Sequence, residues 1–171
     1  GINNVGLYNE SWSDFTGSNL DYVPYMKGGS FKRWYGNQEY VIQLLNEGQV
    51  LTVFLEYKQD CIRGADKIFR RGVTYSYLTS GSFAARLSPG GFIFDVAGSS
   101  LFPDDTFLTL GVLNSEFAAF GLKLINPTVN FQVGDLARLP VPKESSDTIH
   151  GLVDEAVEIA KCDSKDSETT Y

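Results

Sequence analysis

The sequence is poor in the residues that build small disulfide frameworks and metal sites. Its 171 residues include only two cysteines and one histidine. Cys61 and Cys162 lie far apart in unlike surroundings, so neither a disulfide framework nor a zinc knuckle is indicated, and we expect two reduced thiols. His150 has no nucleophile or metal-ligand partner at a recognised spacing, so we expect a surface or helix-capping histidine.

Long apolar runs are also absent. No run approaches the roughly 18 residues that would span a bilayer, and the first residues lack the basic and apolar regions of a signal peptide. We therefore expect a cytoplasmic protein with no membrane partner. Hydrophobic residues nevertheless make up 43% of the chain and aromatic residues 13%, which is enough for one domain with a sizeable core.

Positive charge is scarce overall but concentrated in one part of the chain. Lys and Arg number 14 against 21 Asp and Glu, and the formal net charge of −7 by itself argues against nucleic-acid binding. Residues 27–86 nevertheless carry nine bases and five acids, whereas 1–26, 87–142 and 143–171 each carry more acids than bases. Aromatic residues are interleaved with these bases, a pattern suited to phosphates, sugars and base edges. The alternative interpretation is a solvated face over an aromatic core.

Turn signals and apolar periodicity predict an α+β fold. Residues 1–30 are typical of loop and short strand, and Asp60–Phe69 of a short helix or loop. Strands are predicted within Phe31–Leu45, Val50–Tyr57, Gly72–Tyr77, Phe83–Leu87 and Gly91–Val96, with a turn at Ser88–Gly91.

The second half is predicted to be largely helical. Apolar residues recur at helical spacing over Thr106–Ile125, so we expect one helix against a sheet, started by Asp104 or Asp105 and stopped before Pro127. Its apolar positions are Phe107, Leu110, Gly111, Leu113, Phe117, Phe120 and Leu124. Val129–Val133 is predicted to be a short strand. Ser145–Lys161 is predicted to form an amphipathic, acidic helix. As organisation we expect a domain at 1–143, this helix at 144–162 packed on it or on a partner domain, and a flexible end at 163–171.

No active site assembles from the residues. The triplet Glu56-Tyr57-Lys58 resembles part of a metal-dependent nuclease motif, but three residues match often by chance. Asn126–Val129 lacks the second proline and the aromatic of the loop with which amino-methyltransferases hold a flipped adenine, which favours a helix stop and turn. Gly28-Gly29 could bring the backbone close to a phosphate, although turns use such pairs more often. We expect no catalytic residue, metal site or cofactor in this chain.

Five segments in order resemble one enzyme family. The chain is similar to PglX-type (BrxX) adenine methyltransferases from bacterial BREX phage-defence systems, in their KGG-basic-WYGN, GITWS, F..R.SP.GFIFD..G, LGFLNS and NPTLNFQVGD segments. The matching segments are Pro24–Val41, Gly72–Ser76, Phe83–Ser99, Leu110–Ser115 and Asn126–Asp135. The likeness extends from about residue 25 to 142.

The resemblance implies a C-terminal target-recognition region, a mixed β-sheet α+β module with packed helices related to the specificity domains of TaqI-like methyltransferases and type I specificity subunits. The chain would then be no enzyme by itself. It would bind double-stranded DNA beside an N-terminal adenine-N6 methyltransferase domain of the same polypeptide, where S-adenosylmethionine would bind. The chain departs from the family pattern at Tyr75, where tryptophan is usual, and in the order of its basic residues at Lys32-Arg33.

The basic stretch and the resemblance indicate one candidate DNA-binding surface. Lys27, Lys32 and Arg33 would contact phosphates or a guanine, Asn37 and Gln38 have amides suited to adenine, and Tyr35 accompanies them. Further candidates are Arg70, Arg71, Thr74 and Ser76. The competing interpretation is that Trp34 and Tyr35 are core aromatics, that Asn37 closes a turn beside Gly36, and that Asn126, Thr128 and Asn130 fix the loop after the helix.

Two other functions remain open. In the first, the domain is a protein-interaction module that docks other subunits of a defence complex through the helix at 145–161 and the aromatic surface. In the second, Glu56 and Lys58 belong to a metal-dependent nuclease.

Overall fold

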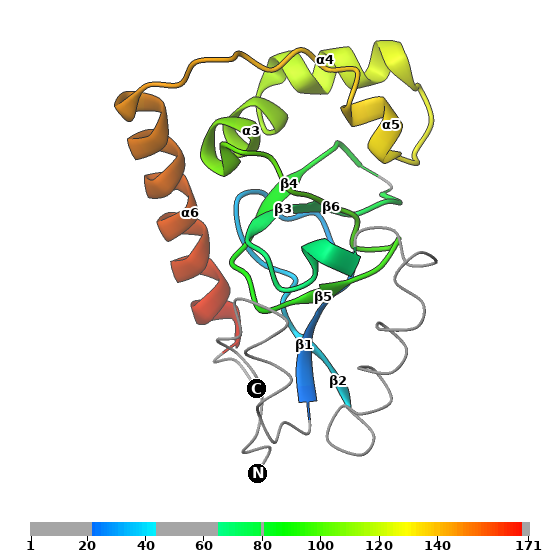
Figure 1. Ribbon diagram of the computed structural model, residues 1–171, viewed down its shortest axis with the longest axis vertical. Helices are drawn as coiled ribbons and strands as arrows, with labels where there is room; N and C mark the ends of the chain where they lie inside the picture. The colour runs from blue at the N-terminus through cyan, green and yellow to red at the C-terminus, as the bar shows by residue number, and fades with distance from the viewer. Residues whose placement is uncertain (1–21, 44–64, 80, 169–171) are drawn as a thin grey trace.

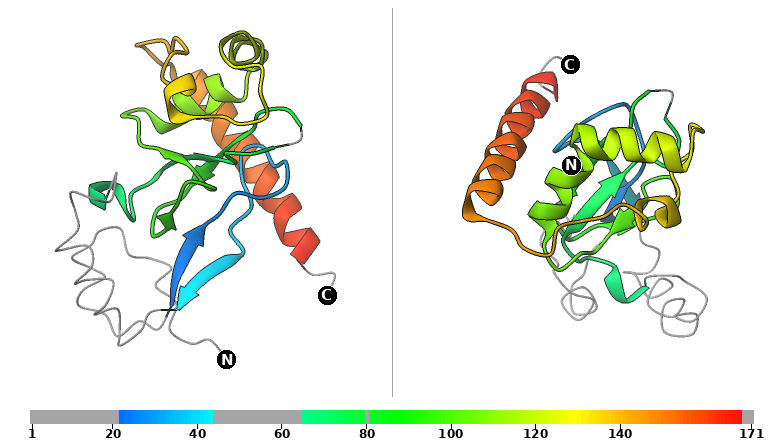
Figure 2. Two further views of the ribbon diagram at one scale, coloured as in Figure 1. Left: turned by 90° about the vertical axis from the view of Figure 1, so that its right-hand side faces the viewer. Right: turned by 90° about the horizontal axis from the view of Figure 1, so that it is seen from above.

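The computed structural model describes residues 22–43, 65–79 and 81–168. In these ranges two small sheets lie beneath three helices, and a long C-terminal helix runs along one side (Figures 1 and 2). The strands are β1 (Tyr22–Met26), β2 (Tyr40–Gln43), β3 (Gly72–Tyr75), β4 (Ala85–Ser88), β5 (Ile93–Phe94) and β6 (Ser100–Leu101). The helices are the 3-10 turn η2 (Ala65–Lys67), α3 (Thr106–Leu113), α4 (Glu116–Ile125), α5 (Val133–Leu136) and α6 (Asp147–Glu168).

The two sheets differ in strand direction. The first has the order β2-β1-β5, with β1 antiparallel to β2 and parallel to β5. The second has the order β4-β3-β6 and is antiparallel throughout, with Val73 of β3 opposite Leu87 on one side and Leu101 on the other. Every residue of β3 and β4 is buried. The predicted α+β class is therefore confirmed, with one mixed and one antiparallel sheet.

The strand predicted within Phe31–Leu45 is wrong for its first nine residues. Within the described residues 31–43 only β2 is a strand, because Trp34 and Asn37 adopt φ angles of 71° and 57° and Gly36 one of 121°, none of which continues a strand. The strand predictions at Gly72–Tyr77 and Phe83–Leu87 are confirmed as β3 and β4, and the one at Gly91–Val96 is reduced to β5. The prediction at residues 50–57 lies outside the described residues, as does the range 60–64.

The single helix predicted over residues 106–125 is two helices. Asp105 caps α3 as predicted, accepting a hydrogen bond from Leu108 N at 2.9 Å, but Ser115 caps a second helix by accepting from Ala118 N at 3.3 Å. The two axes differ by 70°. The bend turns a different face of α4 inward, so Ala118 and Leu122 are buried while Phe117, Phe120 and Leu124, expected in the core, are 54%, 65% and 70% exposed.

The chain after α4 is a braced loop and not the predicted strand. Asn126 ends α4, as predicted, and residue 133 already begins α5; only an isolated bridge joins Asn130 to Leu78. The last helix is present and longer than predicted, since α6 runs to Glu168. α6 packs on α3 through the buried Val153 and Val157.

One core joins the upper helices to the antiparallel sheet. It contains buried residues of β3, β4, the four described α-helices and the segments next to them, namely Val73, Tyr75, Phe83, Ala85, Leu87, Leu110, Leu113, Ala118, Leu122, Phe131, Leu136, Leu139, Val153 and Val157. Trp34 and Tyr35 pack against it while half-exposed, so the prediction that Trp34 contributes to the core is confirmed in part. In the described part of the chain no single helix is long and apolar enough to cross a membrane; α3 and α4 together reach that length and composition, but they are sharply bent.

Candidate nucleic-acid interface

The candidate interface is the basic loop, residues Lys27–Gln38, which connects β1 to β2. The loop begins where two backbones touch, because a Cβ on Gly28 would lie 2.3 Å from the carbonyl oxygen of Ala97. The Ser76 hydroxyl holds the next residue, accepting from Gly29 N at 3.1 Å and lying 3.2 Å from Gly29 O. The glycine pair therefore lies where two segments of the chain cross closely. The backbone that Gly28 approaches is that of Ala97.

The second half of the loop covers the edge of β4. Trp34 N donates to Ala85 O at 2.9 Å and Leu87 N donates to Trp34 O at 2.8 Å, so the loop supplies the hydrogen bonds that a neighbouring strand would supply. Gln38 Nε2 adds a longer bond to Leu87 O at 3.3 Å. The loop is fixed to the sheet by its backbone, which leaves its long side chains free to point elsewhere.

Four of the predicted DNA contacts are engaged inside the fold. Asn37 is buried and donates to Ser30 O at 2.9 Å, in line with the interpretation that it closes a turn beside Gly36. Gln38 bonds to β4 as described above. Thr74 is fully buried, with Oγ1 3.2 Å from Ser99 O, and Ser76 is 8% exposed beneath the loop. Asn37, Thr74 and Ser76 thus support the surface from beneath, whereas Gln38 is half-exposed and is held to β4 by its side chain.

A buried arginine lies under the basic loop. Arg86 is 1% exposed, and both of its terminal nitrogens lie 3.4 Å from Ser76 Oγ. Burial lowers the pKa of Arg86 to about 10, which still leaves the guanidinium charged at neutral pH. It has no ion-pair partner among the described residues. Arg86 thus adds positive potential beneath the loop without reaching its surface.

The basic loop carries three cations, of which Lys32 and Arg33 are half-buried, with Arg33 Nε buried and without a hydrogen-bond partner among the described residues. Lys27 is exposed and stands 5.0 Å above the ring of Tyr40, and Arg33 stands 5.6 Å from the ring of Phe31. Neither they nor Lys32 form an ion pair within the described ranges, whereas Lys67 and Lys161 there are paired with Asp66 and Glu158. Tyr35 is half-buried, with Lys161 Nζ 5.5 Å from its ring centre.

The remaining two candidates lie at the other end of β3. Arg70 and Arg71 precede the strand and Ser76 follows it, so roughly 15 Å of strand separates them from Ser76 and from Gly28-Gly29, where the basic loop begins. Both are exposed, and the Arg71 guanidinium stacks 4.7 Å from the ring of Phe107. The structure therefore brings six candidates together on the loop, places Thr74 and Ser76 beneath it, and leaves this arginine pair apart.

The sole histidine helps to hold α6 against α3. His150 Nε2 lies 2.9 Å from Asp105 Oδ2, the carboxylate that caps α3, and its ring meets Phe107 edge-on at 6.0 Å. His150 is partly exposed and contacts the carboxylate that caps α3, which agrees with the predicted surface or helix-capping role. Among the described residues no group of three His, Cys, Asp or Glu side chains could hold a metal ion, and Cys162 is an exposed free thiol. Glu56, Lys58 and Cys61 lie outside the described residues.

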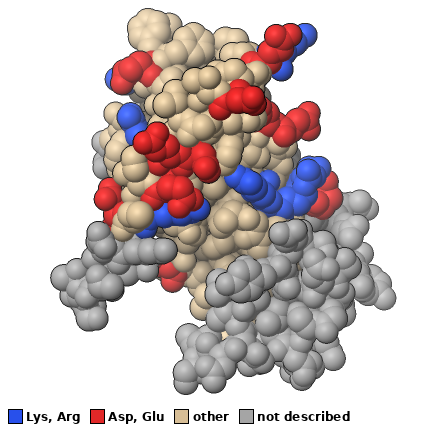
Figure 3. Space-filling model, turned by 90° about the vertical axis from the view of Figure 1, so that its left-hand side faces the viewer, with Lys and Arg blue, Asp and Glu red and all other residues tan. Residues whose placement is uncertain are grey.

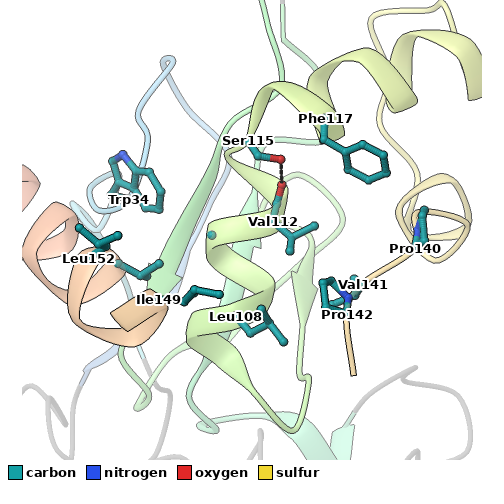
Figure 4. Close-up of a pocket in the computed structure, with 12 residues that line it drawn as sticks. Trp34, Leu108, Val112, Ser115, Phe117, Pro140, Val141, Pro142, Ile149 and Leu152 are labelled. Atoms are coloured by element: carbon teal, nitrogen blue, oxygen red, sulfur yellow. Dashed lines mark hydrogen bonds between the residues drawn. The ribbon is translucent and has the colours of Figure 1, made fainter. Parts of the chain in front are cut away.

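Sequence reasoning missed an apolar groove beside the basic loop. The groove has a volume of about 710 Å³ and lies between α3, α6 and the segment 140–142, with Trp34 at one edge (Figure 4). The sequence carries a signal for the exposed apolar stripe next to the groove, because Phe117, which lines it, is followed by Phe120 and Leu124 in an i, i+3, i+7 pattern. That pattern was attributed to the core, and the break at Ser115 turned it outward.

Polar residues of the five family-like segments form hydrogen bonds between these segments or within one of them. Asn114 bonds to both backbone groups of Ala85 at 3.0 Å, joining the end of α3 to β4. Asn126 Nδ2 donates to Asn130 O at 3.0 Å and to Asp135 Oδ2 at 2.7 Å. The interpretation that Asn126, Thr128 and Asn130 fix the loop after the helix is confirmed, since Thr128 N and Oγ1 also bond to Asn126 Oδ1.

Comparison with known proteins gives two close relatives. The chain is 34% identical over 157 residues to an adenine-specific methyltransferase PglX of Lacticaseibacillus casei (strain Zhang), and 32% identical over 158 residues to an adenine-specific methyltransferase BrxX of Escherichia coli O9:H4 (strain HS). These matches cover 88% and 90% of this chain but only 13% of each relative. No protein-family model matches. The resemblance seen in the five ordered segments is thereby confirmed over most of the chain.

Proposed function

We propose that this chain, which is similar over about nine tenths of its length to a segment of PglX and BrxX adenine-specific methyltransferases, is a target-recognition region that binds duplex DNA. The observation that carries the proposal is the basic loop. It is rigidly tied to β4 by its backbone while Lys27, Lys32 and Arg33 remain without an ion-pair partner in the described part of the chain. Positive side chains on a fixed backbone suit phosphate contacts that set the register of a duplex.

The residues proposed to contact DNA are fewer than those predicted from the sequence. Lys27, Lys32 and Arg33 contact phosphates or a guanine edge, with the exposed Phe31 and Tyr40 beside them. Arg70 and Arg71 form a separate contact, reached by a duplex that extends along β3. Asn37, Gln38, Thr74 and Ser76 act by holding the loop, because their hydrogen-bonding groups are used within the fold.

In this proposal the chain does not itself transfer a methyl group. It has neither a glycine-rich cofactor loop nor a complete Asn-Pro-Pro-aromatic loop, so S-adenosylmethionine and the flipped adenine would be held by an N-terminal methyltransferase domain of the same polypeptide. The chain incubated with S-adenosylmethionine and duplex DNA should therefore leave adenine unmodified. We also propose other subunits of a defence system as further partners.

The proposal is tested by the affinity of the chain for a short duplex at low ionic strength. Lys32→Ala and Arg33→Ala should each weaken binding by several-fold, because each removes one cation from the loop. Lys123→Ala is the matched control, since it removes the same charge from an exposed position on α4 and should change the affinity little. Binding that is absent, or equally sensitive to all three changes, would contradict the assignment of the loop.

A further inference from the structure

The helices α3, α4 and α6 and the segment 140–142 line the apolar groove, with Trp34 at its edge. Leu108 and Val112 of α3 form its floor, Ile149 and Leu152 of α6 one wall, and Phe117, Pro140, Val141 and Pro142 the other (Figure 4). Pro140 and Pro142 have fixed φ angles, which restricts the backbone of this wall.

Exposed apolar stripes extend the groove along both flanking helices. On α4 the stripe is Phe117, Phe120 and Leu124, exposed by 54%, 65% and 70%. On α6, Leu152 and Ile159 lie two turns apart on one side and are 63% and 59% exposed. Phe117 and Leu152 also line the groove, so groove and stripes form one continuous surface. An apolar surface of this extent marks a place where another molecule binds.

The lining does not suit a small polar ligand. Its polar side-chain groups are the indole N–H of Trp34 at the edge and the Ser115 hydroxyl, which already donates to Val112 O at 2.6 Å and caps α4. Small-molecule sites usually place several polar groups to orient the ligand, whereas this groove offers only the Trp34 N–H beside the engaged Ser115 hydroxyl. An apolar helix face needs only a groove of this kind, with anchors at i, i+3 or i+4 and i+7.

The charge beside the groove determines which helix fits. The sequence of α6 carries seven acidic and two basic residues, and Glu155 lies on the same side as Leu152 and Ile159. Figure 3, which views the α6 side, shows acidic side chains predominating on this face. Two copies packed groove to groove would bring two such helices together, and their like charges would repel. A partner with basic residues beside its apolar face is complementary.

We propose that this surface binds an amphipathic helix of a partner protein. The surface consists of the groove and the apolar stripes of α4 and α6. Large apolar side chains of that helix enter the groove between Phe117 and Leu152, and its Lys or Arg residues face Glu155 and its acidic neighbours on α6. The interaction does not depend on DNA binding by the basic loop.

The experiment measures binding of model peptides to the whole chain by calorimetry. The probe is an amphipathic Leu/Lys helix of about 18 residues, roughly five turns, compared with a Leu/Glu peptide of the same pattern. The Leu/Lys peptide should bind and the Leu/Glu peptide should not. Leu152→Ser should weaken binding about tenfold, because an exposed apolar anchor of the groove is lost. Glu155→Lys should weaken the Leu/Lys peptide and allow the Leu/Glu peptide to bind.

Val96→Ser is the matched control, since Val96 is 71% exposed and lies away from the groove. It should leave the peptide affinity unchanged. Equal binding of the two peptides, no binding of the Leu/Lys peptide at millimolar concentration, or equal loss in the control variant would overturn the proposal. So would a dimer of the chain, detected by sedimentation, that Leu152→Ser dissociates, because a second copy would then be the occupant.

Discussion

At the residue scale, the structure explains why certain polar residues occur in the five family-like segments. Asn114 pairs with β4 as a neighbouring strand would, accepting from Ala85 N and donating to Ala85 O at 3.0 Å while 8% exposed. Asn114→Ala should lower the free energy of unfolding by about 2 kcal/mol, since it leaves a buried N–H without an acceptor. Urea unfolding measures the change, and Lys123→Ala should stay within about 0.5 kcal/mol of the parent. A variant as stable as the parent would show that Asn114 matters for some other reason.

Asp105 gives a pH-dependent prediction at the same scale. Partial burial raises the pKa of this carboxyl, but the bonds from Leu108 N and His150 outweigh that effect and lower it below its ordinary value. A lowered folded-state pKa means that the carboxylate stabilises the fold above its unfolded pKa of about 3.9 and loses this contribution as the pH falls through the folded value. Asp105→Asn keeps a capping side chain without the charge and should cost about 0.5 kcal/mol at pH 7.

The stability difference between the parent and Asp105→Asn should vanish in acid. Thermal unfolding of both proteins at neutral pH and below pH 3 measures it. A difference that stays constant across this range would mean that the Asp105 charge contributes nothing. Asp105→Ala should cost more than Asp105→Asn at both pH values, about 1 kcal/mol, because it also removes the cap.

At the scale of elements, the crossing of two backbones fixes where the basic loop begins. A Cβ on Gly28 would lie 2.3 Å from Ala97 O, and one on Gly98 would lie 2.3 Å from Met26 O. Gly28→Ala should therefore destabilise the fold by about 2 kcal/mol, because backbone atoms must move. Gly151→Ala is the matched change, since nothing lies within 4 Å of that position on α6 and alanine favours a helix by about 1 kcal/mol. Thermal melts should shift in opposite directions; shifts of the same sign would contradict this account.

Elements whose structure depends on neighbouring residues could be predicted from the sequence. Elements whose structure depends on contacts between distant segments could not. The strands β3 and β4 follow from their apolar residues, and the cap of α3 from Asp105. The break between α3 and α4 depends on Asn114 reaching β4, which no helical periodicity reveals. Likewise, Phe31–Gln38 has strand-forming residues, yet the loop is held in another shape by its bonds to the edge of β4.

At the scale of the whole molecule, the net charge of −7 conceals two surfaces of opposite sign. The basic loop presents cations that have no ion-pair partner in the described part of the chain, and α6 presents an acidic face (Figure 3). Composition and spacing located the cations in the sequence. Only the fold showed that Asn37, Thr74 and Ser76 face inward and that an apolar groove lies beside the loop, since burial depends on contacts between distant segments.

The salt dependence of duplex binding tests the central claim most directly. For the whole chain at several salt concentrations, the logarithm of the binding constant should fall steeply and linearly with the logarithm of salt concentration, because phosphate contacts release counterions. Lys32→Ala and Arg33→Ala should each reduce that slope by about 0.9, and Lys123→Ala should not change it. A chain that fails to bind at low salt, or a slope that the loop substitutions leave unaltered, would contradict DNA recognition by the basic loop.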